Sequence, residues 1–280
     1  MARHERFRLA GVMGWPIMHS RSPRLHNRWL EIYGVEGVYV PLAIEPGNLQ
    51  AALRALAPLR FSGVNLTIPH KEAALAHVDR IEPAARAIGA INCVVVEPDG
   101  SLTGHNFDSF GFIASLREAE PEWRADAGPA VVIGAGGGAR AIVHGLIEQG
   151  AREVRIVNRT LERAGELRNA FGPAVTPVEW SRRAQALEGA AMLVNATSLG
   201  MVGQGALDLP LRALPRHALV ADIVYAPLET GLLAEARARG NKAVDGLGML
   251  IHQARPAFKA WFGVLPDVTP AIRAMMESTV

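Results

Sequence analysis

Cysteine and long apolar runs are scarce in this 280-residue sequence. Its one cysteine, Cys93, excludes an internal disulfide and is typical of a reducing compartment. No apolar run approaches the ~18 residues of a membrane-spanning helix, and the charged N-terminal segment lacks the apolar core of a signal peptide. The net charge is only +2, and no run of like charges suggests a nucleic-acid tail. We therefore expect a cytoplasmic protein with no membrane or nucleic-acid partner.

Patterns for metal sites and for serine nucleophiles are also missing. None of the nine histidines has H-E-x-x-H or a similar spacing, so no metal is expected. His19 and His26 are interpreted as structural residues. No G-x-S-x-G elbow surrounds Ser20 or Ser22, which disfavours a serine hydrolase.

Short β-like runs alternate with helical segments in two successive series. The first predicts strands at 7–12, 38–44, 61–68 and 90–96 and helices at 23–33, 46–57 and 71–88. The second predicts strands at 130–133, 153–157, 192–195 and 219–224, a short strand ending at 244, and helices at 139–149, 161–171 and 230–239. Two such series favour an α/β protein with two parallel-sheet domains. The tail from Gly248 predicts two helices without a strand, which we expect to complete the first domain.

A glycine-rich segment directly follows the expected strand at 130–133. It has the pattern G-x-G-x-x-A and consists of Gly134, Ala135, Gly136, Gly137, Gly138 and Ala139. The first glycine permits a tight turn, the second lets the backbone approach a pyrophosphate, and the small last residue allows close helix–strand packing. The following helix offers free N–H groups to an anion. A structural turn is the alternative for an isolated match, but the flanking strand and helix favour a Rossmann-type dinucleotide site.

The residues after the next expected strand indicate which dinucleotide is bound. An NAD site typically has Asp or Glu there, to accept a hydrogen bond from the ribose 2′-hydroxyl. This sequence has Asn158, Arg159 and Thr160 instead. A carboxylate would repel a 2′-phosphate, whereas these three side chains can donate to one. The pattern favours NADP over NAD, although an ordinary polar loop is the alternative.

One lysine stands out because the sequence otherwise uses arginine. Of the 29 lysine and arginine residues, only Lys71, Lys242 and Lys259 are lysines. An ammonium group can lose its proton where arginine cannot. Pro69 suits the first turn of a helix, which would put Lys71 near the positive end of that helix, where a cation is disfavoured. Asp108 is the candidate partner acid; the alternative is a surface lysine that points to water.

Two serines lie beside an expected helix start in the segment 14–27. Ser20 and Ser22 could hold a ligand carboxylate there. The alternative is that Ser22 is a plain N-cap, with Pro23 at the first helical position and Gly34 at the C-terminal stop.

These motifs together resemble the shikimate/quinate dehydrogenase family over essentially the whole chain. Many short matches in the family's order are more specific than any one of them. They are Ser20-Arg-Ser22-Pro23 with His26-Asn27, Asn65-x-Thr67-x-Pro69-x-Lys71, Ala90-Ile-Asn92, Gly104-x-Asn106-x-Asp108, the glycine loop, Asn158-Arg159-Thr160, Asn195-Ala-Thr197-Ser198-x-Gly200-Met201, Asp222-Ile-Val-Tyr225-x-Pro227 and Gly246-x-Gly-Met249-Leu-x-x-Gln253.

The resemblance implies an NADP(H)-dependent oxidoreductase that interconverts shikimate and 3-dehydroshikimate in chorismate and aromatic amino-acid biosynthesis. It implies a substrate-binding and catalytic domain formed by 1–108 and 246–280, an NADP-binding domain formed by 109–245, and a monomer or homodimer. Lys71 and Asp108 would be the catalytic pair. The substrate carboxylate would be held by Ser20, Ser22 and Tyr225, and the ring hydroxyls would contact Thr67, Asn92, Asp108 and Gln253. The cofactor would contact the glycine loop, Asn158, Arg159, Thr160, Arg163, Thr197, Ile223 and Gly246.

The sequence departs from the family pattern at two positions beside expected site residues. Phe107 stands where the family usually has a threonine, and Cys93 stands where it usually has another. Phe107 replaces a hydroxyl with an apolar ring, which leaves a quinate dehydrogenase of the same family as an alternative. A non-catalytic NADP-binding regulator is the alternative of another class, but such a protein needs no proton-transfer pair.

Overall fold

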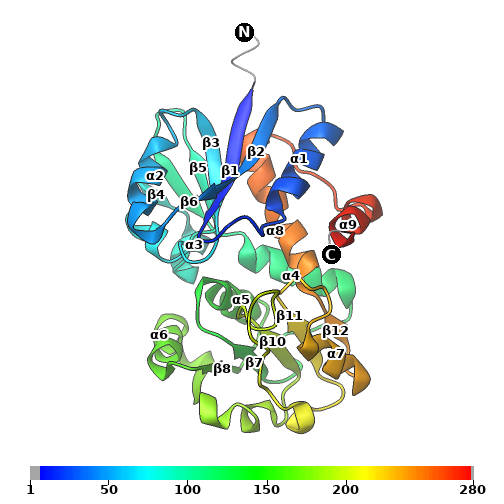
Figure 1. The fold of residues 1–280 in the computed structure, drawn as a ribbon. Helices are drawn as coiled ribbons and strands as arrows, with labels where there is room; N and C mark the ends of the chain where they lie inside the picture. The colour runs from blue at the N-terminus through cyan, green and yellow to red at the C-terminus, as the bar shows by residue number, and fades with distance from the viewer. Residues whose placement is uncertain (1–6, 279–280) are drawn as a thin grey trace. The chain divides into compact units, whose positions relative to one another are not determined.

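The computed structural model describes residues 7–278, which form two compact units. Within this range, unit 1 comprises residues 7–107 and 251–278, and unit 2 comprises residues 108–250. The chain leaves unit 1 after Phe107 and returns inside helix α8 (Gly246–Phe262), as can be followed in Figure 1.

Unit 1 is built on a six-stranded mixed sheet, so the expectation of a parallel sheet is wrong for this unit. Strand β1 runs parallel to β2 and β3, whereas β5 runs antiparallel to β3 and β6. A tight turn at Asp99 and Gly100 joins β5 to β6, and such a short connection can only link antiparallel strands. The order is β2 (Gly37–Ala43), β1 (Arg8–Gly14), β3 (Phe61–Leu66), β5 (Cys93–Val96), β6 (Leu102–His105) and β4 (Arg80–Ile81).

The helices of unit 1 are short, and two sequence expectations about them are wrong. No helix spans 71–88; the segment forms a 3₁₀ turn (Ala73–Ala76), strand β4 and helix α3 (Pro83–Ile88). Pro83 lacks an N–H and its ring clashes with the preceding helical turn, so it suits the first turn of α3 and disfavours one continuous helix through this position. Helix α1 begins at Ser22 with Arg21, not Ser22, as its N-cap. Besides α3, the α-helices of unit 1 are α1 (Ser22–Ile32), α2 (Leu49–Ala55), the part of α8 from Ile251 onward, and α9 (Pro270–Glu277).

The C-terminal helices are tied to the sheet of unit 1 by long-range hydrogen bonds. The indole N–H of Trp261 donates to the Val94 carbonyl at 3.0 Å, and the Arg8 guanidinium donates to the Trp261 carbonyl at 3.0 Å. Arg21 donates to the carbonyl of Met276, near the end of α9, at 3.1 Å. Residues 251–278 are therefore joined by hydrogen bonds to the N-terminal part of unit 1.

Unit 2 is built on a six-stranded parallel sheet with helices on both faces. Its strand order is β12-β11-β10-β7-β8-β9, the doubly wound Rossmann order, with the switch point between β7 and β10. The strands are β7 (Ala130–Ile133), β8 (Val154–Asn158), β9 (Val175–Glu179), β10 (Met192–Asn195), β11 (Leu219–Asp222) and β12 (Ala243–Val244). The helices are α4 (Asp108–Ala119), α5 (Gly137–Glu148), α6 (Leu161–Phe171) and α7 (Gly231–Ala238).

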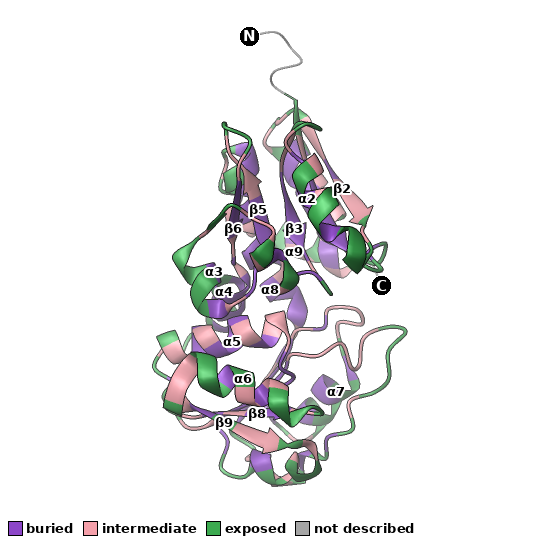
Figure 2. Ribbon diagram, turned by 90° about the vertical axis from the view of Figure 1, so that its left-hand side faces the viewer, coloured by how far each residue is buried: buried purple, intermediate pink, exposed green. Residues whose placement is uncertain are grey.

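Alternate residues of these strands point to opposite faces of the sheet and pack into two separate cores. Val132 and Val194 pack on one face with residues of α4, α5 and α6, while Val131 and Leu193 pack on the other face with residues of α7. Helix α6 turns Ala164 and Leu167 inward and leaves the rest of its surface more exposed (Figure 2). Strands that are buried on both faces explain why the sequence reads there as short continuous apolar runs.

Residues 7–278 contain neither a membrane-spanning helix nor a cluster of metal ligands. No helix in this range has the length and apolar character needed to cross a membrane. No group of three or more His, Cys, Asp or Glu side chains in the same range is arranged to hold a metal ion.

Candidate active site

One edge of the mixed sheet in unit 1 carries most of the expected substrate-side residues. Strands β1 and β3 are parallel and end at this edge, so the segments that follow Gly14 and Leu66 lie there. Strand β5 is antiparallel to β3 and begins at the same edge, directly after Asn92. Strand β6 ends there at His105, two residues before Phe107. The topology therefore brings together four segments that are far apart in sequence.

Main-chain hydrogen bonds join three of these segments around Asn92. The Leu66 N–H donates to the Asn92 carbonyl at 2.8 Å, and the Asn92 N–H donates to the His105 carbonyl at 3.0 Å. The Ile91 N–H donates to the Lys71 carbonyl at 2.7 Å. The segments with Thr67, Lys71 and Asn92 are therefore held in a fixed relation by their backbones.

The Asn92 side chain is buried and oriented by two further contacts. Its Oδ1 accepts a hydrogen bond from the Phe107 N–H at 2.8 Å, and its Nδ2 donates to Gln253 Oε1 at 3.1 Å. Asn92 is 1% exposed and Gln253 is 8% exposed. Because a buried amide with satisfied contacts resists reorientation, these two expected substrate contacts form a preorganised pair.

The expected carboxylate-binding serines lie next to each other at the start of α1. Ser20 Oγ accepts a hydrogen bond from the Ser22 N–H at 3.3 Å. Since Arg21 is the N-cap and gives no side-chain cap, the Ser22 hydroxyl is not used as the cap that the sequence alternative assigned to it. Thr67 lies against Gly14, the last residue of β1, where a Cβ would lie 2.6 Å from Thr67 Cγ2.

The expected catalytic residues belong to different units: Lys71 follows β3 in unit 1, and Asp108 is the first residue of unit 2. Lys71 is half-buried in the turn after Pro69, and no α-helix starts at that proline, so the helix-dipole argument for Lys71 is wrong. Asp108 is 3% exposed and is the first residue of α4, where the helix dipole favours a negative charge. The dipole therefore acts on the acid of the expected pair.

The Phe107 ring lies against His105. The two rings stack with their centroids 5.5 Å apart and an interplanar angle of 21°. Burial lowers the pKa of His105, and the charges of Glu82 and Glu97 only partly oppose this effect. Phe107 thus packs on a largely neutral imidazole while its main chain orients Asn92.

The cofactor-side residues of unit 2 follow four neighbouring strands at the carboxyl edge of the parallel sheet. Gly134 has φ +107°, and a Cβ there would lie 2.9 Å from Thr197 Cγ2 and 3.1 Å from the Ala196 carbonyl. Gly136 is the N-cap of α5, and a Cβ there would meet no atom within 4 Å. The first glycine is thus required for packing between β7 and β10, and the second leaves open space at a helix N-terminus that has no side-chain cap.

Strand β8 is the neighbour of β7 in the sheet, so the segment that follows β8 lies next to the glycine loop. This segment carries polar side chains. Asn158 ends the strand, and its Nδ2 donates to the Thr160 carbonyl at 2.8 Å. Arg159 and Thr160 are exposed and Arg163 is half-buried. Thr160 is the N-cap of α6 but does not cap it with its side chain, so its hydroxyl is not committed to the helix.

A buried polar network shapes the segments after β10 and β11. Asn195 Nδ2 donates to Asp222 Oδ1 at 3.0 Å, and Asn195 Oδ1 accepts from the Thr197 hydroxyl at 2.7 Å. Asp222 Oδ1 also accepts from the Val224 N–H at 2.9 Å, and Oδ2 accepts from the Thr230 hydroxyl at 2.7 Å. Burial raises the pKa of Asp222 to about 6, against the opposing effect of these donors. The network fixes the main chain that carries Thr197 and Ile223.

Three expected cofactor-side residues, Gly138, Ile223 and Gly246, are close to one another in unit 2. A Cβ at Gly246 would lie 2.3 Å from the Ile223 carbonyl oxygen, so only glycine fits against this backbone. A Cβ at Gly138 would lie 3.3 Å from Ile223 Cδ1. Ile223 therefore lies between the glycine loop and the start of α8, and Tyr225 follows two residues later.

The sequence reading did not assign a role to three buried polar residues that the structure places in these networks. They are Asn65, Asn195 and Asp222. All three occur in the recognised motifs and all three end or nearly end a strand. A polar residue at the end of an otherwise apolar strand was the available signal, but its partners are set by tertiary structure.

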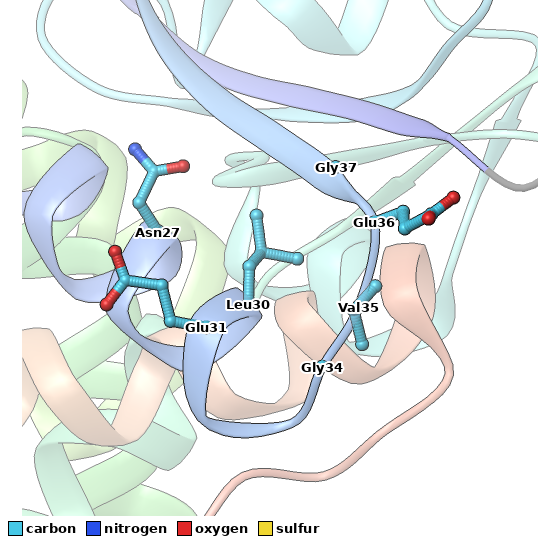
Figure 3. A pocket seen from close by; sticks show the side chains of 7 residues that line it. All are labelled: Asn27, Leu30, Glu31, Gly34, Val35, Glu36 and Gly37. Atoms are coloured by element: carbon cyan, nitrogen blue, oxygen red, sulfur yellow. The ribbon is translucent and has the colours of Figure 1, made fainter.

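A surface hollow of about 420 Å³ lies elsewhere in unit 1, between α1 and β2. Figure 3 shows its lining, with Asn27 and Glu31 on α1 and Glu36 just before β2. It contains none of the expected site residues. We therefore place the candidate site at the sheet edges and not in this hollow.

Comparisons with known proteins agree with this arrangement. Three family models match the chain: the shikimate dehydrogenase substrate binding domain over residues 12–94, shikimate / quinate 5-dehydrogenase over residues 119–223, and the shikimate 5′-dehydrogenase C-terminal domain over residues 246–276. A shikimate dehydrogenase (NADP(+)) of Paramagnetospirillum magneticum is 55% identical over 271 residues, covering 97% of this chain and 98% of the relative.

Two solved structures are also similar. The shikimate 5-dehydrogenase of Thermus thermophilus, in complex with NADP(H) and shikimate, has a TM-score of 0.84 and 39% identity over 97% of this chain and 98% of its own. The quinate dehydrogenase of Corynebacterium glutamicum, in complex with NAD, has a TM-score of 0.86 and 32% identity over 97% of this chain and 98% of its own. By these matches, and by the two sheet edges described above, the chain belongs to the shikimate dehydrogenase family.

Proposed function

We propose that this protein catalyses the NADP(H)-dependent, reversible reduction of 3-dehydroshikimate to shikimate, a step towards chorismate and the aromatic amino acids. The observation that carries the proposal is the 55% identity, over 97% of the chain, to a shikimate dehydrogenase (NADP(+)). The two sheet edges support it, because each presents groups suited to one of the two reactants.

The residues of unit 2 fit an NADP cofactor. Open space at Gly136 and the uncapped N-terminus of α5 suit a pyrophosphate. The exposed Arg159, with Asn158 and Thr160, can donate to a 2′-phosphate, and Arg163 assists from the first turn of α6. Ile223 and Gly246 would line the nicotinamide side, and Thr197 would also contact the cofactor. When bound, the cofactor supplies or accepts the hydride.

The substrate-side residues of unit 1 fit a small polyhydroxylated carboxylic acid. We assign the carboxylate to Ser20 and Ser22 and the ring hydroxyls to Thr67, Asn92 and Gln253; Tyr225 and Asp108, which belong to unit 2, are assigned to the carboxylate and to a ring hydroxyl, respectively. The supporting observation is that Asn92 and Gln253 are buried amides already oriented by hydrogen bonds. A hydroxyl-binding site of this kind rejects analogues that leave its buried amides unpaired.

We assign the proton transfer to Lys71 and Asp108. In the direction of ketone reduction the Lys71 ammonium gives its proton to the developing alkoxide, and in the reverse direction the neutral amine takes the proton of the hydroxyl. Arginine could not do this, since its guanidinium stays protonated. Asp108 would orient the amine and the reacting hydroxyl.

Quinate is the second candidate substrate. It is favoured by Phe107 beside the expected acid and by the structural similarity to a quinate dehydrogenase. That relative is described with NAD, whereas this chain has Asn158 and Arg159 where an NAD site typically has an acid. Shikimate with NADP therefore remains the proposed pair.

The test is to measure formation of the reduced cofactor from shikimate and from quinate, with NADP⁺ and NAD⁺ in parallel. We expect turnover with shikimate and NADP⁺ to have the highest kcat/KM. Quinate turnover much faster than shikimate turnover would replace the proposed substrate. No turnover with either substrate would reject both enzyme assignments and leave the NADP-binding regulator.

The cytoplasmic location and the monomeric or homodimeric state expected from the sequence stay predictions. Size-exclusion chromatography with light scattering would decide the second.

A further inference from the structure

Three residues of the recognised motifs contact neither reactant in the proposed site: His26 and Asn27 on α1, and Asn65 near the end of β3. All three converge on Tyr39 in strand β2. Asn27 Nδ2 donates to the Tyr39 carbonyl at 2.9 Å, and the Tyr39 N–H donates to Asn27 Oδ1 at 2.9 Å. This two-sided clamp fixes the main chain of Tyr39 and hence the direction of its side chain.

The ring of Tyr39 is held from the other side by His26. The two rings stack with centroids 4.1 Å apart and an interplanar angle of 2°. His26 is fully buried, and neither ring nitrogen has a hydrogen-bond partner within the described part of the chain. Burial lowers the pKa of His26 to about 3, so it packs as a neutral ring. Tyr39 is thus fixed without any group that titrates near neutral pH.

The Tyr39 hydroxyl is connected to the main chain of Asn92 through the side chain of Asn65. It donates to Asn65 Oδ1 at 2.7 Å, and Asn65 Nδ2 donates to the Asn92 carbonyl at 3.0 Å. Tyr39 is 1% exposed and Asn65 is 5% exposed. The Tyr39 hydroxyl can donate or accept, but the Asn92 carbonyl can only accept, so only the Asn65 orientation with Nδ2 towards that carbonyl and Oδ1 towards the hydroxyl satisfies both contacts.

We propose that Tyr39 and Asn65 are positioning residues that fix the peptide of Asn92, and through it the amide that Asn92 turns towards substrate. The proposal rests on the proposed function for the identity of the substrate, but the contacts themselves do not depend on it. The Asn92 carbonyl accepts from both the Leu66 N–H and Asn65 Nδ2, while the Asn92 side chain is held by Phe107 and Gln253. Loss of the Tyr39 hydroxyl leaves a buried acceptor on Asn65 without its donor, so the Asn65 side chain is held only through its Nδ2 bond to the Asn92 carbonyl.

The main variant is Tyr39→Phe, which removes one oxygen and keeps the ring that stacks on His26. We expect the KM for shikimate to rise about tenfold while the KM for NADP⁺ stays within about twofold, because the cofactor residues belong to unit 2. The matched control is Tyr33→Phe, which removes a hydroxyl that accepts from the Asp267 N–H at 3.0 Å, also in unit 1. The control should leave both KM values unchanged.

A second readout needs no turnover. The side-chain amide signals of Asn92 in a ¹H–¹⁵N spectrum can be assigned by their loss in Asn92→Asp. In Tyr39→Phe these signals should shift or broaden, and in Tyr33→Phe they should match the wild type. If the wild type fails to oxidise shikimate, the proposed function is wrong, yet these spectra still decide whether Tyr39 positions Asn92.

Stability is followed by thermal unfolding of the same variants. If Tyr39→Phe does not fold, the double variant Tyr39→Phe/Asn65→Leu removes both partners of the buried hydrogen bond and avoids an unpaired acceptor. It should fold and keep the raised KM for shikimate. Unchanged Asn92 signals in a folded variant, or a KM for shikimate equal to that of the wild type, would overturn the proposal.

Discussion

The sheet edges of the two units use different chemical groups to build their sites. In unit 2 the cofactor edge consists of glycine main chain, an uncapped helix N-terminus and the exposed side chain of Arg159. In unit 1 the substrate edge consists of buried amides, Asn92 and Gln253, that hydrogen-bond to each other and to the main chain. Cofactor recognition thus depends on backbone geometry and surface charge, whereas substrate recognition depends on the orientation of buried side chains.

This difference determines how each site should respond to substitution. An exposed cation can be removed with little effect on packing, so the cost should appear only in cofactor affinity. A buried amide cannot be removed without leaving its partners unpaired, so substitutions there should affect substrate binding and stability together.

Lys71→Ala should lower kcat by about a hundredfold to ten-thousandfold, because the proposed proton transfer is lost. The KM for NADP⁺ should change little, since the cofactor residues lie in unit 2. Steady-state kinetics with shikimate measure both values. Lys71→Arg is the matched variant, which keeps the charge but cannot release a proton. Near-normal kcat in either variant would remove Lys71 from the mechanism.

Arg159→Ala should raise the KM for NADP⁺ by about tenfold to a hundredfold, because charge-assisted hydrogen bonds to the 2′-phosphate are lost. The KM for NAD⁺, which lacks this phosphate, should stay nearly constant. The melting temperature should also be unchanged, since Arg159 is exposed. Arg152→Ala is the control, as it removes another exposed arginine of unit 2. Equal changes for both cofactors would contradict the assignment of Arg159 to the phosphate.

Asp222 should make stability depend on pH between its ordinary pKa of 3.8 and its folded value of about 6. In this window the unfolded state releases the proton first, so the free energy of unfolding falls as pH rises. The expected loss is about 1 to 3 kcal/mol. Denaturant unfolding of the wild type and Asp222→Asn at several pH values measures it. As pH rises through this window, the free energy of unfolding of the wild type should fall relative to that of Asp222→Asn. A constant difference in free energy of unfolding would contradict a raised pKa of Asp222.

Phe107→Thr should have the smallest effect, a change of less than about tenfold in the ratio of kcat/KM for shikimate to that for quinate. The Phe107 ring stacks on His105, and its main-chain N–H, which orients Asn92, is retained in the variant. Assays with both substrates give the ratio. A larger switch in preference would mean that the ring, and not only the main chain, decides which substrate is accepted.

The sequence predicted best those parts of the fold whose signal is local. The helix Leu161–Phe171 and the strand Met192–Asn195 have the expected bounds, because apolar periodicity and buried runs report them directly. Strand β9 (Val175–Glu179) was missed because it contains Pro177, which disfavours a strand reading. The residue is tolerated because β9 is an edge strand of its sheet. Helix α4 was also missed, and with it the position of Asp108 at a helix N-terminus.

For the site residues, too, those with a local signal in the sequence were predicted best. The glycine loop was predicted because tight turns and close backbone approach require a specific residue type, which leaves a pattern in the sequence. The partners of Asn65 and Asp222 could not be predicted, because their hydrogen bonds join residues brought together only by strand pairing. The roles of Lys71, Asp108 and the other site residues came from the resemblance and stay predictions until the variants are measured.

Cys93 offers a practical consequence for labelling. It is fully buried at the start of β5, next to Asn92, and burial raises the pKa of its thiol, so the reactive thiolate is disfavoured. The exposed turn at Asp99 lies at the far end of the same strand. A cysteine introduced at Asp99 would therefore be the one accessible thiol of the chain, and a fluorophore attached there would report on unit 1 without any need to remove the native cysteine.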